Sequence, residues 1–540
     1  MICNFFINMF GKFKNKIFFA ISPFILFCVL FSAPAYGAGI MTAASAENEN
    51  GTLEMNLMEA IRIGLRHSRQ VKMTYMDRVL EKFDLAERRA EFQPNITVDG
   101  DLNISSSRTD TDYNEQASSH EQKVSRSAAV NPKAVQKLPT GGELMLQYAW
   151  GHDSRWREDG SGHEDNWSEK GEWRATFTQP LLKGAGTDYN TASLKRTEMD
   201  SREAILGLRD DLSSQVLNII NAYNSLWSAQ ENLRIEKNSL EDAREQMRIN
   251  KLQIETGRKP ESDILQVESN VARQELSYEN ALNSLDQARM NLLDVLDLDL
   301  DREVEAVEEY SFAPKSPDLE RCLRIARENN TAIIRARNNL RRSELTLMQA
   351  KRDKLWDLSF DADYTKTNQN DIDAANRYNE DYWQVGLSLK IPLHFWGQSK
   401  YGYERGVLSA RINLDKSRMQ LKEAMDDLRT EIVNKVRNVR HAEKQVELAR
   451  KSREISYKSY KMDDLKLRLG RITNNDFVDS QERLSSAQKS EVEAIISYID
   501  RLNSLDNYLG TLLETYDLEF KKSRPAVEKK YLEDKTWMLD

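Results

Sequence analysis

The chain has few of the residues on which small secreted domains and many enzymes depend. Its 540 residues include only 3 cysteines, 6 histidines, 11 prolines and 22 glycines. Cys3 and Cys28 lie in the N-terminal segment described below, so Cys322 has no disulfide partner in the rest of the chain, and we interpret it as a small packed side chain. This composition excludes a disulfide scaffold. With charged residues at 30%, it favours long helices with polar surfaces and a narrow apolar seam.

The common catalytic motifs are also missing from the sequence. It contains no Gly-rich phosphate loop with Lys, no His-Glu-x-x-His, no Gly-x-Ser-x-Gly and no cysteine pair. His152 and His163 stand among acidic residues, but the stretch reads as a polar loop rather than a metal site. The net charge is −9 and no basic block stands clear of acids, which argues against nucleic acid. We therefore expect no enzyme, no cofactor, no metal and no nucleic-acid partner.

The N-terminus has the pattern of a secretory signal. Lys12, Lys14 and Lys16 precede an uncharged stretch over 17–31, and small residues follow up to Gly37. This order is typical of a signal peptide cleaved after Gly37, because the apolar stretch is short for an uncleaved membrane anchor. The expected segments are a signal peptide over 1–37 and a disordered stretch over 38–56.

No apolar run of 18 residues follows the signal, so we expect no transmembrane helix in the mature chain. If the mature chain meets a membrane, it must do so with strands, because only helices and closed barrels satisfy their backbone groups in lipid.

The remainder of the sequence is one unit present twice. Each copy has an apolar-patterned helix, a hairpin of alternating residues, a Pro-Leu corner, a very long helix, a Gly-Arg turn and a returning helix. The corners are at Pro180 and Pro392. The first repeat is predicted over 57–300, with its hairpin over 95–180 and helices over 190–255 and 262–297. A linker over 301–317 leads to the second repeat over 318–520, with its hairpin over 357–392, helices over 400–469 and 474–517, and a C-terminal tail over 521–540.

The hairpins alternate apolar and polar residues, as in Ile96, Val98, Leu102 and Ile104. Nothing else in the chain could form a second sheet to cover the apolar face, so the pattern predicts a transmembrane β-barrel. Two hairpins give four strands, too few to close a barrel, whereas three chains would give twelve. The sequence therefore predicts a trimer. We interpret the excess length of the first hairpin as external loops over 106–128 and 151–171, with a small strand pair near 143–150.

The helix after the first corner carries apolar residues at a strict spacing of seven, which is typical of a coiled-coil seam rather than the broad stripe of a globular helix. Over 190–255 it would extend about 100 Å at 1.5 Å per residue. The seam residues are Ile205, Leu212, Ile219, Leu226, Leu233, Leu240, Met247 and Ile254.

Acidic residues follow both Gly-Arg turns. Asp263 stands six residues after Gly257, and Asp476 stands six after Gly470 with Asp479 close behind. In a closed ring these carboxylates would be multiplied by the number of chains, and such a ring selects cations. The alternative is that each Asp only stabilises a helix N-terminus through the helix dipole.

Together, the duplication, the paired hairpins, the Pro-Leu corners and the Gly-x-x-x-x-x-Asp turns resemble the TolC-type outer membrane efflux proteins over nearly all of 53–520. The resemblance implies a trimer with a twelve-stranded barrel in the outer membrane, a twelve-helix α-barrel in the periplasm and a mixed equatorial belt. It places Asp263, Asp476 and Asp479 in a cation-binding ring at tips that close like an iris. It also implies that a periplasmic adaptor contacts the tip residues Gly257, Arg258, Gly470 and Arg471.

The sequence departs from this family at the positions that lock the gate of its best-known member. Leu467 and Ile472 stand where that protein has a Tyr and an Arg, and Arg471 comes one residue early.

The resemblance implies a passive exit duct in the outer membrane of a Gram-negative cell, with a periplasmic extension. Its expected partners are two further copies of the chain, outer membrane lipids, a periplasmic adaptor and an inner-membrane transporter of RND or ABC type. Both small-molecule efflux and type I secretion fit this reading. The alternative from a different class is a secreted, elongated coiled-coil structural or adhesin protein.

Overall fold

The computed structural model describes residues 53–113, 117–159, 162–257, 261, 263–307, 310, 312–371, 376–391, 397–469 and 471–520. The predicted signal peptide and C-terminal tail lie outside these residues, as do Arg258, Pro392 and Gly470. Within the described part of the chain, none of the helices combines the length and the apolar character needed to cross a membrane.

Two short strands join the beginning of the described chain to the segment between the repeats. β1 (Leu53–Met55) pairs in parallel with β6 (Val304–Ala306), with Leu53 opposite Val304. The Met55 carbonyl accepts a hydrogen bond from Tyr223 Oη at 3.1 Å. The prediction of disorder over 38–56 is therefore wrong for 53–55, and the predicted linker over 301–317 contains a strand. Three residues are too few to show a period, and only the long-range pairing defines these strands.

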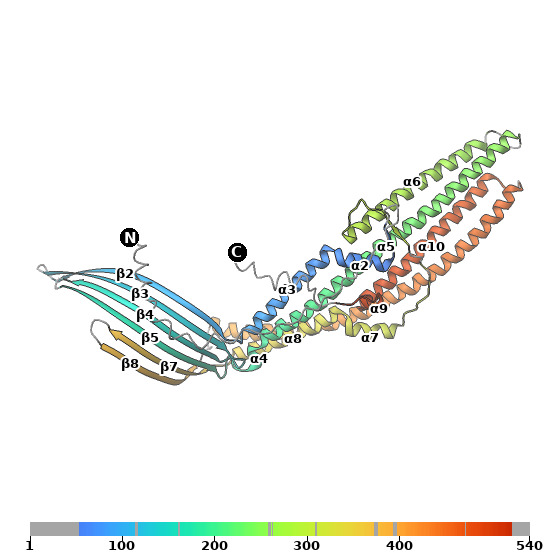
Figure 1. Ribbon diagram of the computed structural model, residues 1–540. Coiled ribbons are helices and arrows are strands. Elements are labelled where there is room, and N and C mark those ends of the chain that lie inside the picture. The colour runs from blue at the N-terminus through green and yellow to red at the C-terminus, as the bar shows by residue number, and fades with distance from the viewer. Residues whose placement is uncertain are drawn as a thin grey trace, which may run out of the picture. The chain divides into compact units, whose positions relative to one another are not determined.

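The helices follow the same order in the two repeats (Figure 1). The first repeat contains α2 (Leu57–His67), α3 (Arg69–Ala90), α4 (Thr187–Asn190), α5 (Ala192–Glu255) and α6 (Asp263–Leu296). The second contains α7 (Leu319–Asn329), α8 (Thr331–Asp353), α9 (Gly397–Arg468), α10 (Asn474–Leu509) and α11 (Leu512–Thr515). The helix predicted over 474–517 stops earlier because Gly510 takes a left-handed conformation with φ of 72°.

The first helix of each repeat is broken by a capping residue. Ser68 lies between α2 and α3, and its side chain accepts a hydrogen bond from the Val71 backbone N–H at 3.3 Å. Asn330 lies between α7 and α8 and accepts one from the Ala332 N–H at 3.0 Å. Both residues have extended ψ angles, 125° and 121°. The apolar pattern continues through Ser68 and predicts one uninterrupted helix there. The break between the two helices is defined only by the N-cap hydrogen bond, as it is at Asn330.

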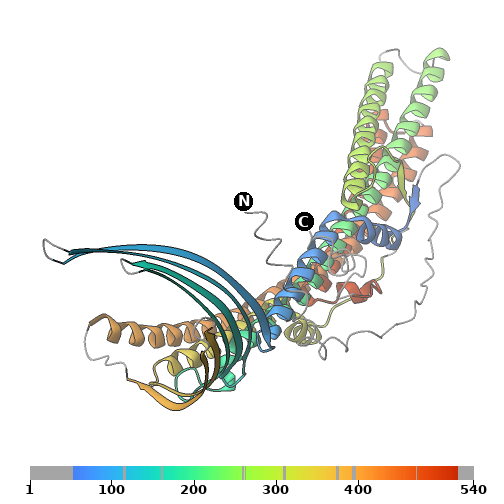
Figure 2. The same cartoon turned by 60° about the vertical axis from the view of Figure 1, so that its left-hand side comes forward.

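The strands form one antiparallel sheet of six, in the order β2-β3-β4-β5-β7-β8. Figure 1 shows these strands curving together at one end of the helices, opposite the tips of α5 and α6, and Figure 2 shows the same curvature from another side. Their bounds are β2 (Asn95–Tyr113), β3 (Ala117–Lys137), β4 (Glu143–Asp159), β5 (Gly162–Pro180), β7 (Asp357–Asp371) and β8 (Asn376–Lys390).

Four of these strands occupy the segment predicted as one hairpin. The described residues of the stretches interpreted as external loops, 106–128 and 151–171, belong almost wholly to strands β2, β3, β4 and β5. The count of four strands per chain is therefore corrected to six in the described sheet. The polar stretches lack apolar alternation, so no periodic pattern indicates that their backbones pair. The pairing is nevertheless continuous, from Ile96 opposite Ala134 to Arg108 opposite Gln122.

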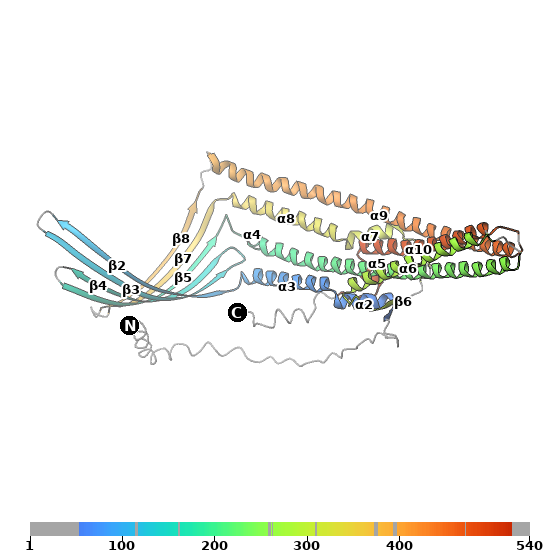
Figure 3. The same cartoon turned by 90° about the horizontal axis from the view of Figure 1, so that it is seen from above.

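The core lies between the helices. One buried cluster gathers around α5 and includes Leu226 and Ile219, and a second gathers around α9 and includes Ile432 and Val439. α10 lies against both α9 and α5, while α5 also contacts α6 and α3 (Figure 3). α9 therefore lies at one edge of the helical layer, and α3 and α6 lie at the other.

The heptad residues of α5 face this core to different degrees. Leu212, Ile219, Leu226 and Leu240 are buried, whereas Ile205, Leu233, Met247 and Ile254 are partly buried.

Candidate functional site at the helical tips

The Gly-Arg turns close the ends of the two long helices. Gly257 follows α5 with φ of 71°, and its N–H donates to the Ile254 carbonyl at 2.9 Å. Arg471 is exposed, and its N–H donates to the Lys466 carbonyl at 2.9 Å, which closes the end of α9. Arg258 and Gly470 lie outside the described residues. The end of α5 thus requires the left-handed conformation that glycine adopts readily.

The candidate ring residues lie near the beginnings of the returning helices. Asp263 is the first residue of α6, while Asp476 and Asp479 lie in the first turns of α10, both exposed. Asp476 forms a capping box with Thr473: its N–H donates to Thr473 Oγ1 at 3.2 Å, and Thr473 N–H donates to Asp476 Oδ2 at 3.0 Å. The Thr473 hydroxyl also donates to Asp476 Oδ2 at 2.7 Å, and this hydrogen bond, together with the one from the Thr473 N–H, lowers the pKa of Asp476. Asp476 therefore caps a helix, and it presents a fixed negative charge at the tip.

A contact between the repeats lies behind the tip and was not foreseen from the sequence. Tyr460 of α9 donates its hydroxyl hydrogen bond to Asp242 Oδ2 of α5 at 2.9 Å. The Tyr460 ring lies 5.4 Å from the ring of Phe477, a buried residue of α10. Burial raises the pKa of Asp242, and burial together with the nearby Asp242 raises the pKa of Tyr460. The contact thus ties both helices of the second repeat to the long helix of the first.

Amide side chains make further links between the repeats. Asn474 Nδ2 donates to Asn250 Oδ1 at 2.8 Å, and Gln266 Nε2 donates to Asn475 Oδ1 at 3.0 Å. A cavity of about 160 Å³ lies among these amides, between α5, α6 and α10. The Asn and Gln residues on these helices could have indicated polar contacts. Their partners could not be predicted, because each pair joins residues more than 200 positions apart in the chain.

Ion pairs also join α10 to the first repeat. Arg273 of α6 pairs with Glu482 at 2.9 Å, and Lys489 pairs with the buried Glu236 of α5. If α10 packed elsewhere, Glu236 would remain buried on α5 without its partner Lys489. The pair therefore favours the packing of α10 against α5.

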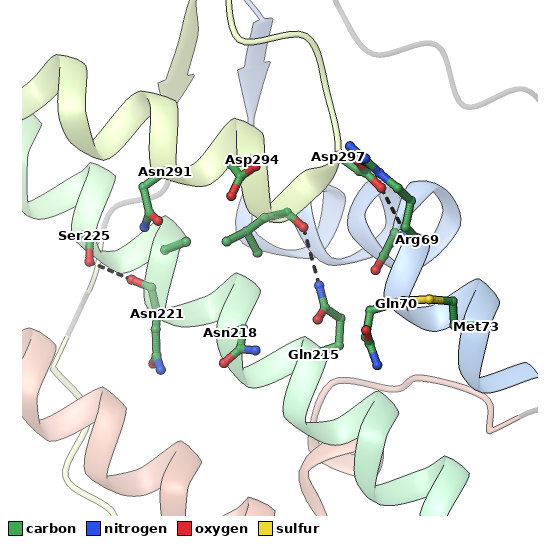
Figure 4. Close-up of a pocket in the computed structure, with 13 residues that line it drawn as sticks. Arg69, Gln70, Met73, Gln215, Asn218, Asn221, Ser225, Asn291, Asp294 and Asp297 are labelled. Atoms are coloured by element: carbon green, nitrogen blue, oxygen red, sulfur yellow. Dashed lines mark hydrogen bonds and ion pairs between the residues drawn. The ribbon is translucent and has the colours of Figure 1, made fainter.

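A groove near the middle of the helices lies between α3, α5 and α6 and has a volume of about 590 Å³ (Figure 4). The ion pair between Arg69 and Asp297 lies at one end, with Arg69 Nε donating to Asp297 Oδ1 at 2.6 Å. The Arg69 guanidinium lowers the pKa of Asp297. The other labelled side chains are mostly amides and hydroxyls, and the described residues contain no cluster of acidic, His and Cys side chains that could hold a metal. The groove is therefore lined mostly by groups that form hydrogen bonds, with the carboxyl groups of Asp294 and Asp297 near Arg69.

Comparisons with known proteins agree with this architecture. The family model described as outer membrane efflux protein matches residues 147–296 and 322–511, which together are more than half of the chain. A comparison with curated proteins gives no match.

Solved structures with the same fold come from several bacteria. The Campylobacter jejuni CmeC outer membrane channel is 14% identical, with a TM-score of 0.58 over 92% of this chain and 98% of that one. The outer membrane protein VceC from Vibrio cholerae is 16% identical, with a TM-score of 0.57 over 86% and 97%. The open-state Neisseria gonorrhoeae MtrE outer membrane channel is 13% identical, with a TM-score of 0.57 over 85% and 89%.

The fold is that of a duplicated efflux channel subunit, and the chain belongs to the outer membrane efflux protein family. It is an outer membrane channel protein with a helical periplasmic extension. The alternative of a secreted coiled-coil adhesin does not account for the family match.

Proposed function

We propose that three copies of this chain form a closed duct that passively conducts substrates from an inner-membrane pump, through a periplasmic adaptor, to the exterior. The duct serves small-molecule efflux or type I secretion, and it does no chemistry of its own. The single observation that carries the proposal is the pair of apolar edges that one chain leaves exposed on its helical layer.

The first edge is a row of exposed apolar residues on α9. Leu448, Ile455 and Met462 of α9 follow one another at a spacing of seven, Leu469 continues the row directly after the helix, and all four are exposed. A heptad row of this kind packs against another helix. α10 lies on a different side of α9, because its contacts use the buried row that includes Ile432 and Val439.

The second edge lies on α6 and α3. Leu265 and Leu276 of α6 are exposed, and so are Leu80 and Phe83 of α3. The two edges are different surfaces at opposite sides of one chain. Contact between them is head-to-tail, and a head-to-tail contact forms a ring when its rotation closes.

In such a ring the acidic residues at the tip gather around the pore. Asp476 and Asp479 of three copies, with Asp263 beside them, would line the periplasmic entrance with carboxylates and favour cations. The low pKa of Asp476 keeps its charge at neutral pH. The turns at Gly257, Arg258, Gly470 and Arg471 would meet the adaptor, because the described members, Gly257 and Arg471, come just after the ends of the long helices α5 and α9.

The α9 edge can be tested with one charged substitution and a matched control. Ile455→Asp places a carboxylate in the exposed heptad row, whereas Lys461→Asp places one on an exposed position of α9 that is neither three nor four residues from any member of the row. We expect Ile455→Asp to abolish the trimer extracted from outer membranes, as measured by native mass spectrometry, and Lys461→Asp to leave it intact. Equal yields of trimer from both variants would contradict the proposal that this row of α9 contacts the next chain.

The acidic ring is tested in planar bilayers. Asp476→Asn with Asp479→Asn should reduce cation preference and weaken block by divalent cations, because the ring loses most of its charge. Asparagine still accepts a hydrogen bond at position 476, which preserves part of the helix cap. An unchanged reversal potential in a salt gradient would show that these residues do not line the entrance.

A further inference from the structure

We propose that the barrel of this channel is built from eighteen strands, six from each of three chains, rather than twelve. The inference rests on the proposed trimer and deepens it, because it defines which strand edges the copies use and how wide the exit is. The observation behind it is the placement of β2 and β3 in the same sheet as the four strands nearer the second repeat.

The six strands share one apolar face. The register places Ile96 opposite Ala134, Ala134 opposite Leu146, and Leu146 opposite Ala175. Ala175 stands opposite Tyr364, and Tyr364 opposite Trp383, so a single row crosses the whole sheet. Side chains alternate between faces, so the residues two places along each strand lie on the same side.

This face is exposed on the first two strands as on the others. Leu102 of β2 is 83% exposed and Val130 of β3 is 43% exposed, compared with 48% for Leu146 of β4 and 69% for Leu387 of β8. An external flap over the mouth of a narrower barrel would meet water on both faces, and a continuous apolar row would then be costly. The apolar row of β2 and β3 fits a wall that meets lipid.

The opposite face of the same strands is polar. Thr97, Asp99, Asp101 and Asn103 occupy it on β2, and Asp361 and Asp363 occupy it on β7. Apolar-out and polar-in alternation is the pattern of a strand that faces lipid on one side and a water-filled lumen on the other.

The two edges of the sheet are the places where copies meet. Among the described residues, β2 pairs only with β3 and β8 pairs only with β7. β2 follows α3, and β8 precedes α9 across a short segment, so each strand edge continues the helical edge described above. β2 and β8 run in opposite directions relative to the helices, and β8 of one chain can therefore pair antiparallel with β2 of the next. Closure of this kind leaves no strand edge in the membrane.

The comparison of the two repeats indicates that one hairpin is additional, because four strands lie between α3 and α4 in the first repeat and two lie between α8 and α9 in the second. In the first repeat the match begins at residue 147, within β4, whereas in the second repeat it spans α8 and both strands β7 and β8. Like α2 and α3, β2 and β3 lie outside the matched residues. They form a hairpin added at the edge of a four-stranded sheet, and this edge is the one that contacts the next chain.

The added hairpin widens the exit. With strands about 4.8 Å apart and tilted by about 40°, a barrel of twelve strands has a backbone diameter of about 24 Å and one of eighteen strands about 36 Å.

The test is an electron cryo-microscopy reconstruction of the full chain extracted from outer membranes. We expect three-fold symmetry and a wall of eighteen strands. A three-fold particle with a wall of twelve strands overturns the inference and leaves the proposed duct intact. A particle without three-fold symmetry overturns the proposed duct itself.

A deletion gives an independent test. Removing residues 95–137 takes out β2 and β3 and joins Pro94 to Leu138. The ends to be joined lie close together, because Asn95 pairs with Val135. The pairing of β4, β5, β7 and β8 needs no change, so we expect a three-fold particle with twelve strands. A diameter equal to that of the parent protein would overturn the inference.

The matched control shortens the same hairpin without removing a strand. Replacing residues 109–121 by Asn-Gly connects Arg108 to its partner Gln122 through a two-residue turn. We expect this variant to keep eighteen strands and the parent diameter. A narrower wall in this control would mean that hairpin length, not strand number, sets the width.

Discussion

The two repeats are alike in their helices and unlike in their strands. Each begins with two helices separated at a capping residue, Ser68 or Asn330, and each ends with a long helix and a returning helix. The first contributes four strands to the sheet, and the second contributes two. The helical part of the protein has kept its duplication, whereas the strand part has not.

The physical reason is that an additional helix disturbs the helical layer, whereas an additional hairpin need not disturb the sheet. A helix added to the layer would displace α10 from its contacts with both α5 and α9, including the Lys489–Glu236 pair. A hairpin added at the edge of a sheet disturbs no existing pair. It returns the chain to the same end of the sheet, and it repeats the apolar face. A barrel therefore changes strand number more easily than a packed helical layer changes helix number.

The largest expected effect tests whether the two helical cores are equivalent. Leu226 of α5 and Ile432 of α9 are both fully buried, each in the cluster of its own repeat. Leu226→Asp and Ile432→Asp each bury an unpaired charge, so we expect each to cost several kcal/mol, on the order of 3–5, and to abolish folded protein in the outer membrane. Heat-modifiability on gels measures this loss. Normal recovery of only one variant would show that the repeats differ in their cores as well as in their strands.

A smaller effect distinguishes the two helix breaks. Asn330 caps α8 and also donates its side-chain Nδ2 to the Tyr508 carbonyl at 3.2 Å, whereas Ser68 only caps α3. We expect Ser68→Ala to lower the free energy of unfolding by about 1 kcal/mol, and Asn330→Ala to lower it by about 2 kcal/mol, because the second change also leaves a partly buried carbonyl without its donor. Chemical denaturation of the purified protein in detergent measures both values. Equal losses would mean that the bond to Tyr508 contributes nothing.

The smallest effect concerns the contact that joins the repeats. The pKa of Asp242 is raised by burial, so the folded protein binds a proton more tightly than the unfolded chain. Stability therefore falls as pH rises from the ordinary carboxyl value near 4 through the raised pKa. We expect the thermal midpoint of the parent protein to decrease over this window relative to that of Asp242→Asn, which does not titrate and can still accept the Tyr460 hydrogen bond.

The control for this pH effect is Tyr460→Phe, which keeps the ring against Phe477 and removes the hydroxyl. We expect the thermal midpoint of Tyr460→Phe to depend on pH more strongly than that of the parent protein. In this variant Asp242 loses the hydrogen bond that favours its ionised form, so its pKa in the folded state is raised further. An identical pH profile for the parent protein and Asp242→Asn would contradict the burial of this carboxyl group.

Much of the helical architecture could be predicted from the sequence because it depends on local patterns. The long helix expected over 190–255 is α5, Ala192–Glu255, and the helix expected over 262–297 is α6, Asp263–Leu296. Seven-residue spacing over many turns is a strong signal, and glycine at the end of α5 marks its boundary clearly.

The strand number and the contacts behind the tip could not be predicted in the same way. The outer halves of β3 and β4 are polar on both faces, and their pairing is visible only in the backbone. The Tyr460–Asp242 hydrogen bond joins residues 218 positions apart, and no local period relates them. Asp476 was recognised as a candidate charge, but its capping box with Thr473 depends on backbone geometry.

The residue pattern predicts a duplicated unit with coiled-coil helices and strands of alternating polarity, and its resemblance to a known family implies a channel subunit. Such patterns have short periods, and a period can be read from neighbouring residues. Three properties emerge only in the folded chain: the described sheet has six strands, its apolar face is continuous, and its edge strands β2 and β8 continue the helical edges at α3 and α9. Those properties depend on which distant segments lie side by side. The alternation within one strand shows which face is apolar, but it does not show which other strand pairs with it.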